Sequence, residues 1–201
     1  MESDQTPAAA LAQEIKKYYT QQDSALDFSK KFHFYSRYYL WTKDPHAKQI
    51  LDEMKDTYLD LETPTKDQIQ KKRASSSDRQ KLIQDEYPTL PFLSKILFRY
   101  LFAKNVYNKD ITKEAIAALS PATLETYRSK LYHHPEHVAR LSTTAINFLF
   151  LVDLLIPVNE HGEKRSTDIN FLWRTYQEYS WGNKPKETQL RIYYLTHCII
   201  N

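Results

Sequence analysis

Glycine is scarce in this 201-residue chain. Only Gly162 and Gly182 are present, whereas average usage of about 7% would give roughly fourteen. Glycine provides the positive-φ turns and the close backbone approach that phosphate-binding loops require. Two glycines twenty positions apart cannot form a P-loop, a G-x-G-x-x-G dinucleotide turn or a G-x-S-x-G nucleophile elbow. The sequence therefore lacks the loops of the common nucleotide-binding proteins and serine hydrolases.

Cysteine and long apolar runs are also scarce. The single cysteine, Cys198, cannot form an intramolecular disulfide, which favours a reducing compartment. The most apolar segment, residues 146–156, has eleven residues and contains Asp153, whereas a membrane-spanning helix needs about 20. The N-terminus begins with acidic residues and has no apolar core of a signal peptide. We expect a cytoplasmic protein that does not associate with a membrane.

Charge of one sign does not dominate any part of the chain. Residues 1–100 contain 16 Lys and Arg against 15 Asp and Glu, and residues 101–201 contain 12 against 10. A non-specific nucleic-acid-binding protein usually has a clear basic excess. Nucleic-acid binding through Lys71, Lys72 and Arg73 together with the basic and aromatic segment 30–43 is therefore only the third functional hypothesis.

The sequence contains many helix-start signals. In four places a capping residue precedes a proline: Thr6-Pro7, Asp44-Pro45, Ser120-Pro121 and His134-Pro135. Between these signals the apolar residues recur at spacings of three and four, which is typical of amphipathic helices. Besides helices after Pro7 and Pro45, the pattern predicts helices over 24–43, 90–107, 111–119, 122–132, 136–156, 167–181 and 186–200. The expected fold is all-α, an irregular bundle or stack of about nine to ten antiparallel helices without a sheet.

Polar segments indicate how the chain is divided. Residues 65–88 begin with a polar, serine-rich stretch and are predicted to join an N-terminal helical part, 1–64, to a C-terminal helical part, 89–201. The two parts are expected to pack together as one domain. Residues 157–168 are predicted to form a surface loop that ends in a Ser or Thr helix cap. The apolar last helix has no capping glycine, so it is either the final core helix or part of a longer chain.

The segment "YHHPEH", residues 132–137, places three histidines and a glutamate in six positions. The proline after His134 predicts a helix joint, with His133 ending one helix and Glu136 and His137 beginning the next. On this interpretation only His134 and His137 can converge, and two ligands do not make a metal site. The helix joint is the preferred interpretation, with a metal or acid–base site as the alternative, and no cofactor is expected.

Asp153 lies within the most apolar segment of the chain. An ionised carboxylate buried there without a partner would cost several kcal/mol, so it is expected to be exposed, paired or protonated. Perturbed carboxylates in apolar surroundings are candidates for function, although structural ion pairs are commoner. An enzyme with an inter-helix cavity would use Asp153, His137 and Glu136 as acid–base residues.

Two segments combine aromatic and basic residues, 30–43 and 171–181. Tryptophan, tyrosine and arginine are enriched among the residues that contribute most to protein–protein binding. The predicted binding residues are Trp173, Arg174, Tyr176 and Trp181 in the second segment and Arg37, Tyr38 and Trp41 in the first. Core packing and, for the first segment, base stacking are the alternatives. The first functional hypothesis is thus a helical protein-interaction or scaffold domain with another protein as its partner and without catalysis of its own.

Overall fold

The structure is a computed structural model that describes residues 14, 17, 18, 20, 21, 26–59, 77–158 and 161–200. Within these residues it contains ten α-helices, and the only strand-like pairing in the same residues is an isolated bridge between Val158 and Lys164. The predicted all-α class is confirmed. The chain divides into two compact units, Met1–Leu59 and Asp60–Asn201, which we call the N-terminal and C-terminal units.

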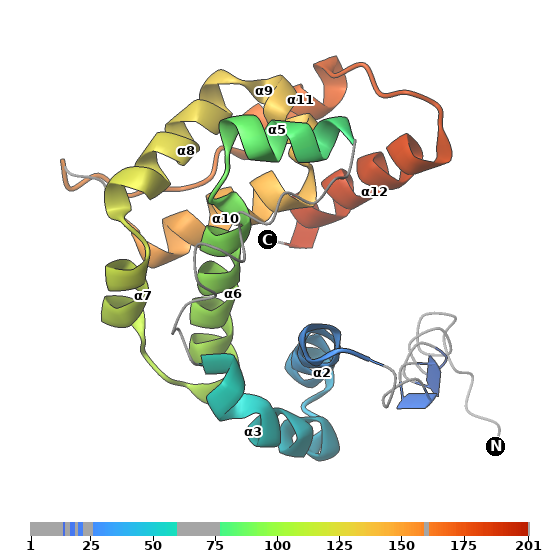
Figure 1. The fold of residues 1–201 in the computed structure, drawn as a ribbon, viewed down its shortest axis with the longest axis vertical. Helices are drawn as coiled ribbons and strands as arrows, with labels where there is room; N and C mark the ends of the chain where they lie inside the picture. Colours follow the sequence, from blue (N-terminus) through green and yellow to red (C-terminus); the bar gives the residue numbers. More distant parts are fainter. Residues whose placement is uncertain are drawn as a thin grey trace. The chain divides into compact units, whose positions relative to one another are not determined.

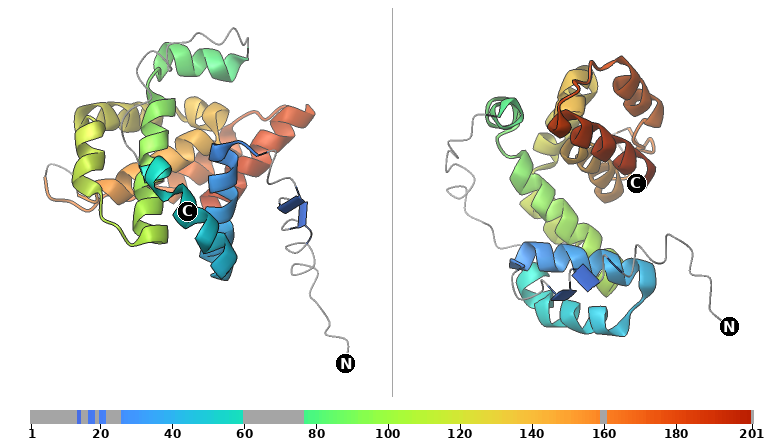
Figure 2. Two further views of the ribbon diagram at one scale, coloured as in Figure 1. Left: turned by 60° about the horizontal axis from the view of Figure 1, so that its bottom comes forward. Right: turned by 90° about the vertical axis from the view of Figure 1, so that its right-hand side faces the viewer.

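The N-terminal unit is built on two helices, α2 (Phe28–Thr42) and α3 (Pro45–Leu59), which pack along each other (Figure 2). An aspartate, one of the preferred N-cap residues, precedes each helix. The Asp27 carboxylate accepts a hydrogen bond from the Lys30 amide at 2.9 Å, and that of Asp44 accepts one from the Ala47 amide at 3.0 Å. The Asp44-Pro45 start predicted from the sequence is therefore confirmed.

The C-terminal unit contains the other eight described helices. In chain order they are α5 (Asp78–Glu86), α6 (Leu90–Tyr107), α7 (Thr112–Ala118), α8 (Pro121–His133), α9 (Pro135–Leu141), α10 (Thr143–Leu155), α11 (Ile169–Glu178) and α12 (Pro185–Ile200). The apolar α10 is central in this unit (Figure 1), because it packs against α6, α8, α9 and α12. Its side chains Ile146, Phe148, Leu149 and Val152 are completely buried.

The predicted single helix over 136–156 is wrong. The chain bends by 110° between α9 and α10, at Ser142, whose φ of 49° is in the region that favours glycine. The buried Ser142 hydroxyl donates to the Leu190 carbonyl of α12 at 3.0 Å. This contact holds the corner against α12. The apolar periodicity of the sequence gives no indication of it.

No single helix among the described residues is long and apolar enough to cross a membrane. The bent pair of α9 and α10 meets the length and composition criteria only when its two helices are taken together.

Two of the helix starts predicted at a proline are confirmed in position, but the side-chain cap predicted before the proline does not form. Helices α8 and α9 begin at Pro121 and Pro135, yet neither Ser120 nor His134 makes a side-chain capping bond. The predicted Ser or Thr cap at the end of the 157–168 loop is wrong, since the Asp168 carboxylate caps α11 by accepting from the Phe171 amide at 3.0 Å.

The predicted division at 65–88 stays a prediction. Residues 65–76 lie outside the described part of the chain, as does the Thr6-Pro7 helix start. The last residues of the predicted joint form helix α5, where the Ser77 hydroxyl accepts from the Gln80 amide at 3.3 Å.

Candidate functional sites

Five aromatic residues gather where α11, the turn after it and α12 meet. We call Trp173, Tyr176, Tyr179, Trp181 and Tyr194 the aromatic cluster. The Trp173 ring stacks on Tyr176 with centroids 5.4 Å apart and planes 21° from parallel. Trp181 lies 5.8 Å from Tyr176 and 5.6 Å from Tyr194, so the rings are in mutual contact.

The cluster is anchored at its inner end. Tyr194 is fully buried, and its hydroxyl donates to the Leu172 carbonyl at 2.8 Å. Burial raises the pKa of this phenol, which therefore remains a hydrogen-bond donor at neutral pH. Trp181, beyond the end of α11, donates its indole N–H to the Tyr176 carbonyl at 2.8 Å. Helix α11 ends at Glu178, three residues before the end of the helix that was predicted over 167–181.

Arg191 of α12 fixes the outer part of the cluster. Its Nε donates to the Tyr176 hydroxyl at 2.9 Å, and its guanidinium lies 5.3 Å from the centre of the same ring. The sequence-based choice of Arg174 missed this residue, because Arg191 is fifteen positions from Tyr176. Arg174 is exposed on α11.

The outer end of the cluster faces solvent. Trp173 is 51% exposed, and Ile169, one helical turn before it, is 48% exposed. Residues four apart on a helix are surface neighbours, so these two exposed apolar side chains lie on the same face of α11. The aromatic cluster thus contains a buried tyrosine, Tyr194, at one end and an exposed tryptophan, Trp173, at the other. Trp173 belongs to the segment that was predicted to bind a partner.

In the N-terminal unit two of the predicted binding residues, Arg37 and Tyr38, make hydrogen bonds to residues close in the sequence. Arg37 donates to the His33 Nδ1 at 2.7 Å, and burial lowers the pKa of its guanidinium. The Tyr38 hydroxyl donates to the Asp44 carboxylate at 3.4 Å. The side chain of Trp41 lies outside the described part of the structure.

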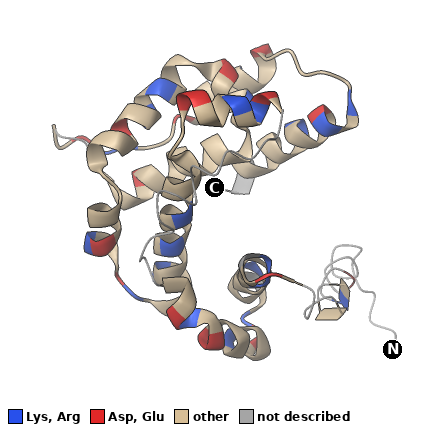
Figure 3. Cartoon of the chain, viewed as in Figure 1, with Lys and Arg blue, Asp and Glu red and all other residues tan. Residues whose placement is uncertain are grey.

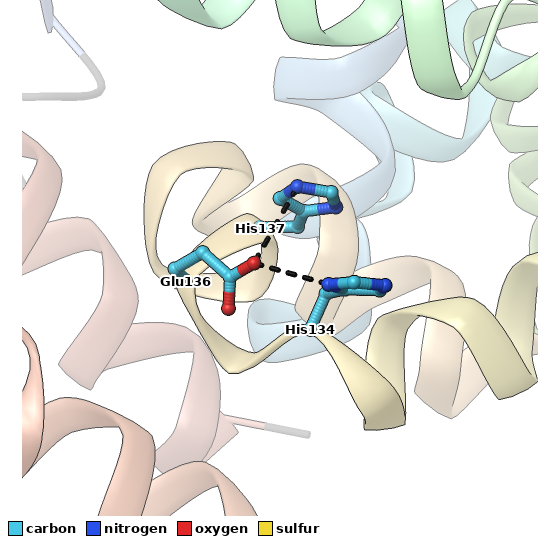
Figure 4. Close-up of side chains that lie close together, drawn as sticks. All are labelled: His134, Glu136 and His137. Carbon is cyan, nitrogen blue, oxygen red and sulfur yellow. Dashed lines mark hydrogen bonds and ion pairs between the residues drawn. The ribbon is translucent and has the colours of Figure 1, made fainter.

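The "YHHPEH" segment forms the joint between α8 and α9, as predicted. His133 lies in the last turn of α8, where its Nδ1 is 2.8 Å from the Ser129 carbonyl. His134, Glu136 and His137 lie close together (Figure 4), and we call them the histidine–glutamate cluster. The sequence interpretation expected two converging residues and missed Glu136, whose carboxylate reaches back toward both imidazoles.

Distances within the cluster are short. Glu136 Oε1 lies 3.1 Å from His134 Nδ1 and 3.6 Å from His137 Nε2. The two imidazole rings are stacked at 4.7 Å with planes 17° from parallel. Imidazole and carboxylate are the groups that bind transition-metal ions such as zinc.

A buried tyrosine contacts the histidine–glutamate cluster through His137. Tyr87, fully buried after α5, shares a hydrogen bond of 3.0 Å between its hydroxyl and His137 Nδ1. Burial lowers the pKa of His137. Burial alone would raise the pKa of the Glu136 carboxyl, but hydrogen bonds from its own backbone amide and from His134, together with the charge of the neighbouring histidines, lower this pKa overall. At neutral pH the cluster therefore contains a neutral His137 imidazole beside the ionised Glu136 carboxylate.

Asp153 is buried and paired. Its side chain is 7% exposed, Arg128 Nε donates to Oδ1 at 2.9 Å, and the Thr167 hydroxyl donates to Oδ2 at 2.9 Å. Both oxygens are therefore occupied by structural partners from α8 and from the loop before α11. The sequence hypothesis that grouped Asp153 with His137 and Glu136 finds no support in these contacts.

Charges of both signs are scattered along the same helices of the described chain (Figure 3). The basic triplet Lys71, Lys72 and Arg73 of the nucleic-acid hypothesis lies outside the described residues. Comparisons of the chain with protein-family models, with curated proteins and with solved structures found no match.

Proposed function

We propose that this chain is a helical protein-interaction domain that binds another protein through the exposed end of the aromatic cluster on α11 and α12. The observation that supports this most is Trp173. It is half exposed, yet its ring is held in place by stacking on Tyr176. Exposed tryptophan beside tyrosine and arginine is the composition of a binding hot spot.

Pre-organisation strengthens the argument. Immobilising a flexible side chain on binding costs about 0.5–1.5 kcal/mol, and this cost is smaller where the ring is already fixed. Here Tyr176 is fixed by Arg191, and Trp181 and Tyr194 contact the same ring from the protein side. A partner that covers Trp173 and Ile169 would thus meet a rigid apolar surface bordered by a cation.

The test compares Trp173→Ala with Tyr193→Ala. Tyr193 is 45% exposed on α12, and its hydroxyl accepts from Gln189, so this variant removes an exposed aromatic ring that has no part in the aromatic cluster. Affinity capture from the source cells, quantified by mass spectrometry, identifies proteins retained by the wild type and by Tyr193→Ala but lost with Trp173→Ala.

A protein identified in this way is then purified and its binding measured by calorimetry. A hot-spot residue contributes at least about 2 kcal/mol, so Trp173→Ala is expected to raise Kd roughly 30-fold or more. Tyr193→Ala should change it less than about threefold. Equal capture by both variants, or equal affinity in the purified complex, would show that the aromatic cluster is not the binding surface.

A further inference from the structure

The histidine–glutamate cluster has the spacing of a metal site. One ligand-type atom from each of His134, Glu136 and His137 lies within 4.8 Å of the other two. In a tetrahedral zinc site with bonds of about 2.0–2.1 Å, neighbouring ligand atoms are about 3.3–3.4 Å apart. The distances from Glu136 Oε1 to the two imidazole nitrogens, 3.1 and 3.6 Å, lie on either side of this value.

We propose that His134, Glu136 and His137 bind a Zn²⁺ ion at the joint between α8 and α9, with one coordination position open to solvent. Two nitrogens and one carboxylate oxygen without a thiolate are a donor set suited to zinc. Calcium and magnesium prefer sites made wholly of oxygen ligands, so this donor set disfavours them. The site uses none of the side chains of the aromatic cluster and is independent of the function proposed for that cluster.

Tyr87 has the position of an outer partner that orients a ligand. Metal-bound histidines usually donate their second ring N–H to a neighbouring acceptor, which sets the tautomer and the ring orientation. When His137 Nδ1 carries the proton, it donates to the Tyr87 hydroxyl oxygen at 3.0 Å. Nε2, which lies 3.6 Å from Glu136 Oε1 and is joined to it by a dashed line in Figure 4, then keeps its lone pair available for a metal ion.

The remaining adjustment is small and falls on an exposed residue. The two imidazole nitrogens have to approach by at most about 1.4 Å to reach tetrahedral spacing. The side chain of His134 is 47% exposed, whereas that of His137 is 14% exposed and held by Tyr87. Rotation of His134 out of its stacked position therefore completes the site without moving the helices.

The experiment is calorimetric titration of the chelator-treated full chain with Zn²⁺ in a buffer that does not bind metal. We expect one tight equivalent. Since His134 and Glu136 are about half exposed, His134→Gln and Glu136→Gln should fold normally, and each should weaken binding by more than about 100-fold. Tyr87→Phe removes only the outer hydrogen bond and should weaken it about 10–100-fold.

His133→Gln is the matched control, because it removes the adjacent histidine, which faces Ser129 and lies outside the cluster. It should leave the tight equivalent unchanged. Substitution with Co²⁺ gives a second readout, a visible absorption band typical of tetrahedral coordination that His134→Gln abolishes. The proposal is overturned if the wild type binds no more tightly than His134→Gln, or if His133→Gln weakens binding as much as His134→Gln does.

Discussion

Replacement of Asp153 by alanine is expected to destabilise the C-terminal unit by about 3 kcal/mol. The substitution removes the acceptor of two hydrogen bonds, from Arg128 Nε and from the Thr167 hydroxyl, each 2.9 Å long. It also leaves the Arg128 guanidinium, whose side chain is 18% exposed, without its closest anion. Breaking a buried ion pair from one side costs about 3–5 kcal/mol, since a charge remains away from water.

The lower end of that range applies here. Glu125 Oε1 lies 3.9 Å from Arg128 Nη1, and the guanidinium also lies 5.0 Å from the centre of the Tyr132 ring. These contacts still stabilise the arginine when Asp153 is absent. A loss of about 3 kcal/mol corresponds to a decrease in Tm of roughly 6–12 °C for a chain of this size.

Urea denaturation followed by circular dichroism measures the change. Asp85→Ala is the matched control, because Asp85 is exposed on α5 and its removal should change the free energy of unfolding by less than about 0.5 kcal/mol. The double variant Arg128→Met, Asp153→Leu should recover most of the stability, since it leaves no buried charge unpaired. A loss below about 1 kcal/mol in Asp153→Ala would refute the structural role argued for this pair.

Two further predictions concern the corner at Ser142 and the thiol of Cys198. Ser142→Ala removes the hydrogen bond to Leu190 and keeps the positive φ, so we expect the free energy of unfolding to fall by about 1 kcal/mol or more. Ser142→Gly removes the same hydrogen bond but relieves the backbone strain, so it should be the more stable of the two variants in thermal unfolding. The opposite order would contradict the strain argument. Burial raises the pKa of the Cys198 thiol to about 11, so its alkylation in the folded chain should be slower at pH 8 than in urea and should keep rising about tenfold per pH unit above pH 9. An alkylation rate that levels off near pH 9 in the folded chain would contradict the shift.

The sequence predicted the helices well because the signals for a helix are local. Prolines at positions 121 and 135 mark the starts of α8 and α9 as expected, and the apolar spacing in the last helix matches α12. The same local signals placed Glu136 in the first turn of α9 and His133 in the last turn of α8. The choice of residues 171–181 as an aromatic surface rested on composition alone, and the structure gathers its tyrosines and tryptophans around Tyr176.

The break at Ser142 could not be predicted in this way. Apolar residues continue through it with helical spacing, and no glycine or proline interrupts the segment. The corner depends on a hydroxyl that reaches a carbonyl of α12, 48 positions later. The corner between the two helices is thus held by a contact that forms only when the helices pack.

Partners of the polar residues were decided in the same manner. Sequence alone indicated that Asp153 needs a partner if it is buried, but Arg128 becomes that partner only when α8 packs against α10, across 25 positions. Tyr87 supports His137 from 50 positions away. Helix caps and apolar periodicity involve residues within about four positions and are therefore readable from the chain itself. Buried ion pairs, the fixed tyrosine of the aromatic cluster and the support beneath the histidine–glutamate cluster join distant segments, so only the tertiary structure determines them.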